Sequence, residues 1–248
     1  MAHQREKPLG SQGGGSTFLP ELPSNNFGSA NTYTEPGSDD RYSFLAEFDT
    51  ILLVDDSGSM AGGRWRDTAN AVSALAELVT RYDTDGIDVH FLNARGRCNM
   101  TKPQEIMGLF RATKPQGGTP LAKALDNILK PYLGVYARDP EHCKPINIIV
   151  ITDGEPTDDP ESTIIQYATR LDKLEAAPRQ VGIQFVQIGN EPGATEYLKY
   201  LDDVLYEDSK TRDMVDTVPW MGVSGPEWLL KATLGAVCRR YDRMCYKS

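Results

Sequence analysis

Histidine and cysteine are scarce in this chain, and their placement excludes several kinds of site. The 248 residues include three histidines and four cysteines, with no CxxC pair and no two histidines close in sequence. Zinc motifs and serine triads need such residues, so we expect neither histidine-based zinc chemistry nor a catalytic triad. We expect the cysteines to be free thiols that behave as small buried apolar residues. The residues concerned are His3, His90, His142, Cys98, Cys143, Cys238 and Cys245.

Basic residues are also in deficit. The sequence has 26 Lys and Arg against 35 Asp and Glu, which gives a formal net charge of −9. A surface that binds phosphate backbones must be positively charged, and no basic arm is present. We therefore expect no nucleic-acid partner.

Long hydrophobic runs are absent. The longest apolar stretch lies near residues 146–151, whereas a helix that crosses a bilayer needs about 20 apolar residues. The first residues lack the apolar core of a signal peptide. We expect no membrane span and a cytoplasmic location.

The N-terminal part of the chain lacks any sustained apolar period. Residues 1–43 are rich in Gly, Ser, Pro and Asn and contain the run GSQGGGS. Such a segment buries too little apolar surface to offset the entropy lost on ordering. We interpret residues 1–43 as a flexible tail and residues 44–248 as one domain.

What the domain does contain is an alternation of apolar runs and amphipathic stretches. This alternation is typical of an α/β fold with a doubly wound, mostly parallel sheet and helices on both faces. Two runs, residues 50–54 and 146–152, are continuously apolar, as in central parallel strands. Further strands are predicted at residues 87–92, 182–188 and, at an edge, 204–206. Helices are predicted at residues 65–82, 104–111, 119–130, 162–175, 194–201 and 227–244.

The most informative stretch is ILLVDDSGSM, residues 51–60. An apolar strand ends there in Asp55, Ser57 and Ser59, whose side chains can turn toward one point. Open α/β folds place ligands beyond the carboxyl ends of their strands, and oxygen donors suit a hard cation such as Mg²⁺. We expect Gly58 to leave room for neighbouring backbone to pack closely.

The other central strand repeats this design, because residues 146–152 end in Asp153. A Gly117-Gly118-Thr119-Pro120 loop lies between the two strands in sequence. Two carboxylates brought together repel each other, and a divalent cation relieves that repulsion. The predicted metal-site residues are Asp55, Ser57, Ser59, Thr119 and Asp153. Asp56 points the other way if strand alternation continues, which makes it a surface or supporting residue.

Each part of this pattern also has an ordinary structural explanation. Ser57 and Ser59 could cap the next helix, and Thr119 before Pro120 is a good N-cap. Asp158 and Asp159 could favour the start of a helix. Caps do not require all the parts to occur together, so the combination favours a metal site.

Three motifs together resemble the von Willebrand factor type A domain with its metal-ion-dependent adhesion site, of an intracellular type. They are DxSxS at Asp55 to Ser59, Gly-Gly-Thr-Pro at Gly117 to Pro120, and Thr-Asp-Gly at Thr152 to Gly154. The resemblance covers roughly residues 48–240. It implies a Rossmann-like fold with Mg²⁺ at the sheet edge, with Mn²⁺ or Ca²⁺ as substitutes. It also implies that Ser57 and Ser59 contact the ion, that Asp55 and Asp153 act through water, and that Thr119 joins when a partner binds.

The leading functional hypothesis is a protein-interaction module, not an enzyme. By the resemblance, a partner protein supplies an Asp or Glu carboxylate that completes the coordination of the ion. One rival is a magnesium-dependent phosphoacceptor of the receiver type, which would want a lysine after a late strand, where this chain has Gly189-Asn190-Glu191. Another is a scaffold whose metal only stabilises the fold. The sequence leaves the partner and the oligomeric state open.

Overall fold

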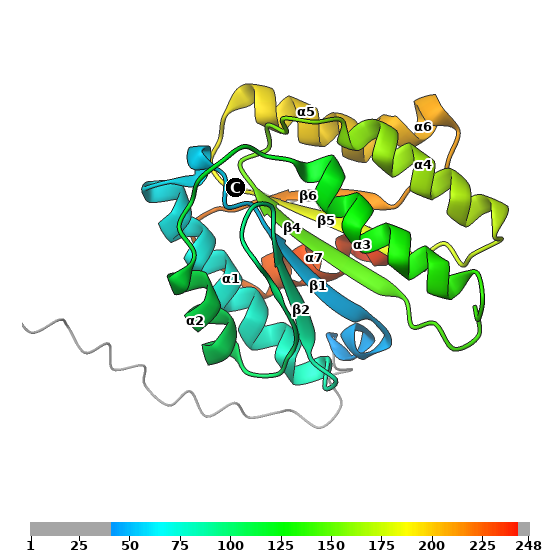
Figure 1. The fold of residues 1–248 in the computed structure, drawn as a ribbon, viewed down its shortest axis with the longest axis horizontal. Helices are drawn as coiled ribbons and strands as arrows, with labels where there is room; N and C mark the ends of the chain where they lie inside the picture. The colour runs from blue at the N-terminus through cyan, green and yellow to red at the C-terminus, as the bar shows by residue number, and fades with distance from the viewer. Residues whose placement is uncertain (1–40, 243–248) are drawn as a thin grey trace, which may run out of the picture. The chain divides into compact units, whose positions relative to one another are not determined.

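A six-stranded sheet forms the centre of the structure (Figure 1). The strand order is β3-β2-β1-β4-β5-β6, and every neighbouring pair is parallel except β2 and β3. This arrangement confirms the predicted doubly wound, mostly parallel α/β fold. The strands are β1 (Asp49–Val54), β2 (Ile87–Phe91), β3 (Arg97–Met100), β4 (Ile146–Thr152), β5 (Val181–Gln187) and β6 (Val215–Pro219).

The computed structural model describes residues 41–242. Residues 1–40 of the predicted tail, together with His3 and Cys245, lie outside the described residues. Within them, the domain is already packed at Tyr42, whose hydroxyl donates to the Pro226 carbonyl at 3.0 Å. The 3-10 helix η1 (Ser43–Glu47) then buries Leu45 against the last helices.

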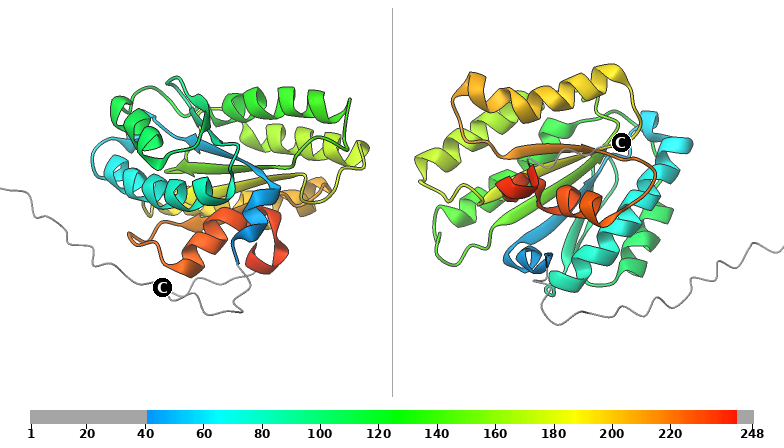
Figure 2. Two further views of the ribbon diagram at one scale, coloured as in Figure 1. Left: turned by 90° about the horizontal axis from the view of Figure 1, so that it is seen from below. Right: turned by 180° about the vertical axis from the view of Figure 1, so that it is seen from behind.

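Helices cover both faces of the sheet because the central strands are apolar at most positions on both sides. On one face, α3 (Leu121–Tyr136), α4 (Pro160–Lys173) and α5 (Pro192–Asp203) pack over Leu53 and Val150. On the other, α1 (Gly63–Tyr82), α2 (Pro103–Ala112) and α7 (Pro226–Leu234) pack over Val54 and Ile151. Figure 2 shows the sheet between these two layers. Successive strand residues point to opposite faces, so a strand covered on both sides is hydrophobic along most of its length.

The predicted edge strand at residues 204–206 is wrong. That segment is helical, forming α6 (Leu205–Ser209), and the edge strand is β6. Leu205 is buried among the helices of the α4 face, whereas Val204 is exposed. Burial of Leu205 against these helices thus outweighed the β propensity of Val204 and Tyr206.

The predicted closing helix at residues 227–244 is interrupted. It consists of α7, the 3-10 turn η3 (Gly235–Val237) and the short α8 (Arg239–Asp242). A Cβ at Gly235 would overlap the Asp216 and Gln184 side chains, and Gln184 Oε1 accepts the Ala236 amide at 3.1 Å. The helix therefore breaks where its backbone touches the sheet.

Two further differences concern local signals. α3 continues through Pro131 to Tyr136, although proline removes one helical hydrogen bond, because Leu133 and Tyr136 remain in the core. The short strand β3 has an exposed, polar sequence and was not predicted.

Among the helices of residues 41–242, none has the length and apolar character needed to cross a bilayer.

Candidate metal site

The site lies where β1 and β4 end. These strands are parallel neighbours with Val54 opposite Ile151, so the loops that follow them meet at one edge of the sheet (Figure 1). The order of the strands reverses between β1 and β4, because β2 lies on one side and β5 on the other. Such a reversal opens a crevice that α/β proteins use for ligands.

Four of the five predicted residues line one pocket of about 490 Å³ at this edge, namely Ser57, Ser59, Thr119 and Asp153. The structure therefore brings the three predicted loops together. The fifth residue, Asp55, is fully buried and reaches the pocket through its neighbours. The remaining lining residues are Arg64, Gly117, Gly118, Glu155, Thr157 and Glu191.

Asp55 joins the first loop to the third. Its Oδ1 accepts the Ser57 amide at 2.8 Å, and its Oδ2 accepts the Thr152 hydroxyl at 2.7 Å. The same hydroxyl oxygen accepts the Gly154 amide at 3.0 Å. Burial raises the pKa of Asp55, the hydrogen bonds from Ser57 and Thr152 oppose this rise, and the charge of Asp153 adds to it. A cation near the two carboxylates would favour their ionised forms.

Backbone hydrogen bonds attach the second loop to both others. The Gly58 amide donates to the Gly117 carbonyl at 3.0 Å, and the Thr157 amide donates to the Thr119 carbonyl at 2.9 Å. Asp56 supports the same region as a fully buried residue. Its carboxylate accepts the amides of Asn93 and Ala94 at 2.8 and 2.9 Å. Asp56 is thus a supporting residue that fixes the loop after β2.

The glycine that allows close approach is Gly117. Its φ of +85° is left-handed, and a Cβ there would lie 2.7 Å from Asn93 Oδ1. A Cβ at Gly58 would meet only the Gly117 carbonyl at 3.6 Å, an ordinary contact. Our expectation that Gly58 provides the room was therefore wrong.

The site hydroxyls do not cap helices. The N-cap residues of α1 and α3, Gly62 and Pro120, make no side-chain cap hydrogen bond. The amides of Ala122 and Lys123 at the start of α3 instead donate to Asp158 at 2.9 and 3.0 Å. Thr119 is thus not the N-cap that its position before proline suggested. Asp159 caps α4, as expected of a helix start.

The donor set fits a hard divalent cation. Asp153 Oδ1 is buried without a hydrogen-bond partner, and leaving such an atom unsatisfied is costly. Ser57 and Ser59 hold their hydroxyl oxygens 2.9 Å apart. Hydroxyl and carboxylate oxygens are the ligands that Mg²⁺ and related ions prefer.

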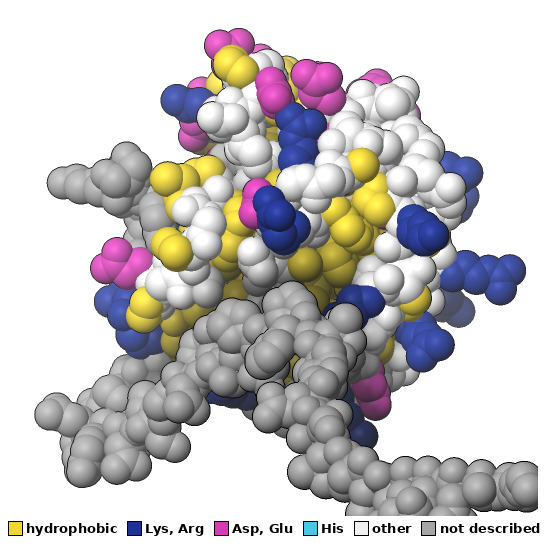
Figure 3. All heavy atoms as spheres, turned by 90° about the vertical axis from the view of Figure 1, so that its left-hand side faces the viewer, with side chains coloured by type: hydrophobic (Ala, Val, Ile, Leu, Met, Phe, Trp, Pro, Cys, Tyr) yellow, Lys and Arg dark blue, Asp and Glu magenta, His cyan; other side chains and the backbone are white. Residues whose placement is uncertain are grey.

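Arg64 at the start of α1 was not foreseen. Its guanidinium lies 3.3 Å from Asp153 Oδ2 and 2.6 Å from Glu191 Oε1. It also donates to the Ser59 carbonyl at 3.3 Å. No motif marks Arg64 or Glu191, because the contact depends on how α1 and the loop after β5 pack. Figure 3 shows the sheet-edge side of the molecule, where acidic and basic side chains lie close together around hydrophobic ones.

Comparison with known proteins finds similarity in structure only. No family model and no curated protein matches the sequence. Among solved structures, manganese-loaded TRAP from Plasmodium vivax has a TM-score of 0.50 and 20% identity, over 71% of this chain and 70% of that one. An aerotolerance-related membrane protein from Bacteroides fragilis has a TM-score of 0.48 and 12% identity, over 77% and 98%. Mussel byssus proximal thread matrix protein 1, with zinc in its MIDAS motif, has a TM-score of 0.43 and 15% identity, over 74% and 44%.

These are von Willebrand factor type A structures. The fold of this chain is that of a von Willebrand factor type A domain. The strand order and the TRAP similarity support that statement. The roles of individual site residues rest on their own geometry.

Proposed function

We propose that this domain binds a partner protein through a divalent cation held at the end of β1 and β4. Ser57 and Ser59 would contact the ion directly, and Thr119 would join them when the partner binds. Asp55 and Asp153 would act through water. The ion would supply a coordination position for an Asp or Glu carboxylate of the partner. Mg²⁺ is the favoured ion, and Mn²⁺ and Ca²⁺ are accepted alternatives.

The observation that carries this proposal is the unpartnered Asp153 Oδ1 in a pocket that Ser57, Ser59 and Thr119 also line. Hydroxyl ligands are neutral, so an ion held mainly by them keeps much of its charge and attracts an external carboxylate. The chemistry is that of binding, and we propose no catalytic role. We also retain an intracellular location as a prediction from the sequence.

Titration calorimetry of the full chain with MgCl₂ and MnCl₂ tests the metal site. Ser57→Ala should weaken metal binding at least about tenfold. Loss of a residue that only supports a metal ligand already costs about tenfold in affinity, and Ser57 is proposed to contact the ion directly. Ser73→Ala is the matched control, because Ser73 is an exposed serine on α1 and its loss should change nothing. Equal affinities in wild type and Ser57→Ala would refute the site.

A peptide array tests the interaction itself. Peptides with a single Asp or Glu should bind the Mg²⁺-loaded domain, whereas matched Asn or Gln peptides should not. Binding should disappear with chelator and in Thr119→Ala. If Mg²⁺ raises Tm but no carboxylate peptide binds, the metal has only the stabilising role of a scaffold, and the interaction proposal is wrong.

A further inference from the structure

A second group of potential metal ligands lies on the hairpin that β2 forms with β3, the outermost strand of the sheet. Asp88 and His90 are two apart on β2, so they point to the same face of the strand. Their neighbours Ile87, Val89 and Phe91 point the other way into the core. Cys98 lies on β3, the antiparallel partner of β2.

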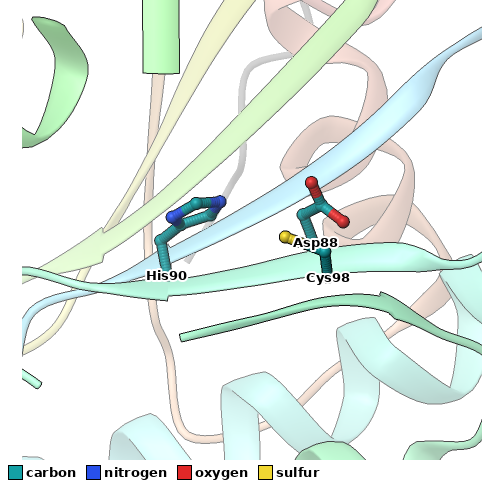
Figure 4. Close-up of side chains that lie close together, drawn as sticks. All are labelled: Asp88, His90 and Cys98. Atoms are coloured by element: carbon teal, nitrogen blue, oxygen red, sulfur yellow. The ribbon is translucent and has the colours of Figure 1, made fainter. Parts of the chain in front are cut away.

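The ligand atoms of these side chains converge. A carboxylate oxygen of Asp88, a ring nitrogen of His90 and the Cys98 sulfur all lie within 4.8 Å of one another. Figure 4 shows the three side chains on one side of the hairpin. Around a tetrahedral zinc ion such atoms lie roughly 3.5 Å apart, given bond lengths of about 2.0–2.3 Å. Cys98 is exposed, so its side chain can rotate to close this gap.

The hairpin backbone contributes to the arrangement. The register of the β2–β3 pair shifts between Ile87 and Val89, and Asn99 adopts a left-handed φ of +55°. The Asn99 amide donates to Asp88 Oδ1 at 2.9 Å. This bond fixes the Asp88 carboxylate and leaves its other oxygen for a ligand.

The group also borders a pocket. Asp88, His90 and Asn99 line a cavity of about 340 Å³, whose other residues include Asn127 and Tyr132 of α3. Three protein ligands leave one position of a tetrahedral ion open. The cavity gives that position space for water or a small ligand.

The ligand atoms of this group differ from those of the cation site at the ends of β1 and β4. Sulfur and imidazole ligands favour zinc-class transition metals over Mg²⁺. Burial lowers the pKa of His90, and the Asp88 carboxylate opposes this fall. Cys98 would bind a metal as the thiolate, so binding would release its proton into solvent.

Two other carboxylate groups in the described residues are of a different kind. Lys144 lies 2.8 Å from Asp49 and 3.2 Å from Asp85, and Lys231 lies 2.7 Å from Asp216. A lysine there already supplies the positive charge that a metal would provide.

We propose that Asp88, His90 and Cys98 form a second metal site, which takes a zinc-class divalent ion and leaves one coordination position open to the adjoining cavity. The site is separate from the cation site at the ends of β1 and β4. It differs from our sequence-based expectation of no histidine-dependent zinc chemistry, because Cys98 comes near His90 only through strand pairing.

Cobalt titration of the full reduced chain tests the site. Co²⁺ bound to a thiolate produces a near-ultraviolet charge-transfer band, which we expect for wild type and which added Zn²⁺ should remove. Cys98→Ala should abolish the band, whereas Cys143→Ala should keep it as the matched cysteine control. Asp153→Ala should also keep it, which separates this site from the one at the sheet edge.

Zinc affinity gives a second measurement. In competition with a chromophoric chelator, His90→Gln and Asp88→Asn should each bind Zn²⁺ at least about tenfold more weakly, because loss of even an outer-sphere partner has that effect. Circular dichroism should show both variants folded. The proposal is overturned if wild type gives no thiolate band, if Cys143→Ala loses it equally, or if the folded variants bind zinc as wild type does.

Discussion

Arg64 places a positive charge at the cation site. Its guanidinium contacts Asp153 and Glu191, and Arg64 is about one third exposed. The Asp153 carboxylate has two different surroundings, since Oδ2 faces the guanidinium and Oδ1 has no partner. A divalent ion that used Asp153 would therefore compete with Arg64 for the negative charge of this carboxylate.

Replacing Arg64 with glutamine should strengthen cation binding. Removing a like charge beside the ion should increase Mg²⁺ and Mn²⁺ affinity by up to about fivefold, since an exposed charge pair is worth up to about 1 kcal/mol. Calorimetric titration measures the effect. Arg66→Gln on the same helix is the control, because Arg66 is exposed. Unchanged or weaker binding in Arg64→Gln would show that Arg64 does not compete with the ion.

At the scale of elements, the site depends on where α3 begins. Asp158, from the loop after β4, binds the first amides of α3. The neighbouring Thr157 amide holds the Thr119 carbonyl. A carboxylate at a helix N-terminus satisfies free amides and interacts favourably with the helix dipole. One loop thus fixes both the start of the helix and the hydroxyl in front of it.

Asp158→Ala should therefore destabilise the domain and weaken the site. Loss of the cap should cost about 1 kcal/mol, which lowers Tm by roughly 2–4 °C in a domain of this size. Thermal denaturation measures the change in Tm, and Mg²⁺ titration measures the change in cation affinity. Asp158→Asn, which keeps an acceptor oxygen, should show a smaller loss of stability. A Tm equal to that of wild type in Asp158→Ala would contradict the capping role.

Across the whole molecule, buried carboxylates affect stability. Burial, together with the charge of Asp216, raises the pKa of Asp202 to about 8. Burial also raises the pKa of Asp216 to about 6, although Lys231 opposes the rise. Lys231 donates to Asp216 Oδ1 at 2.7 Å and to the Asp242 carbonyl at 2.6 Å. This group connects α5, β6 and the last helices.

The domain should be more stable at pH 6 than at pH 8. The folded state holds protons on Asp202 and Asp216 that the unfolded chain releases near the ordinary value of 3.8. The folded state therefore binds more protons across this range, and the free energy of unfolding falls as pH rises toward about 8. His90, whose pKa burial lowers from 6.5, opposes this trend at the acidic end of the range and contributes less than Asp202. Asp85 and Asp159, whose pKa values are lowered, act with the opposite sign only at more acidic pH.

Asp202→Asn tests this assignment. The variant should raise Tm at pH 8 by at least about 2 °C, the shift that roughly 1 kcal/mol produces in a domain of this size, and should flatten the dependence of Tm on pH. Glu196→Gln is the control, since Glu196 is exposed on the same helix and does not contribute to the raised pKa of Asp202. Parallel Tm profiles for wild type and Asp202→Asn would assign the pH dependence to other groups.

Local contacts limited what could be predicted. The cysteines were expected to be buried, yet Cys98 is exposed and Cys143 and Cys238 are only partly buried. Strand β3 has the polar sequence Arg-Cys-Asn-Met and forms because β2 offers it a free edge. Neither the exposure of a thiol nor the pairing of a polar edge strand has a periodic signal in the sequence.

The sequence by itself determined the central strands β1 and β4, the acidic and hydroxyl residues that follow them, and the predicted convergence of the three loops. It could do so because strands buried on both faces are apolar at most positions, and parallel strands deliver their ends to one edge. Only the tertiary structure decided that Arg64 faces Asp153, that Gly117 packs against Asn93, and that Cys98 lies beside His90. The first two contacts join segments far apart in the chain, and the third crosses a hairpin with a shifted register. All three exist only once helices and strands have packed.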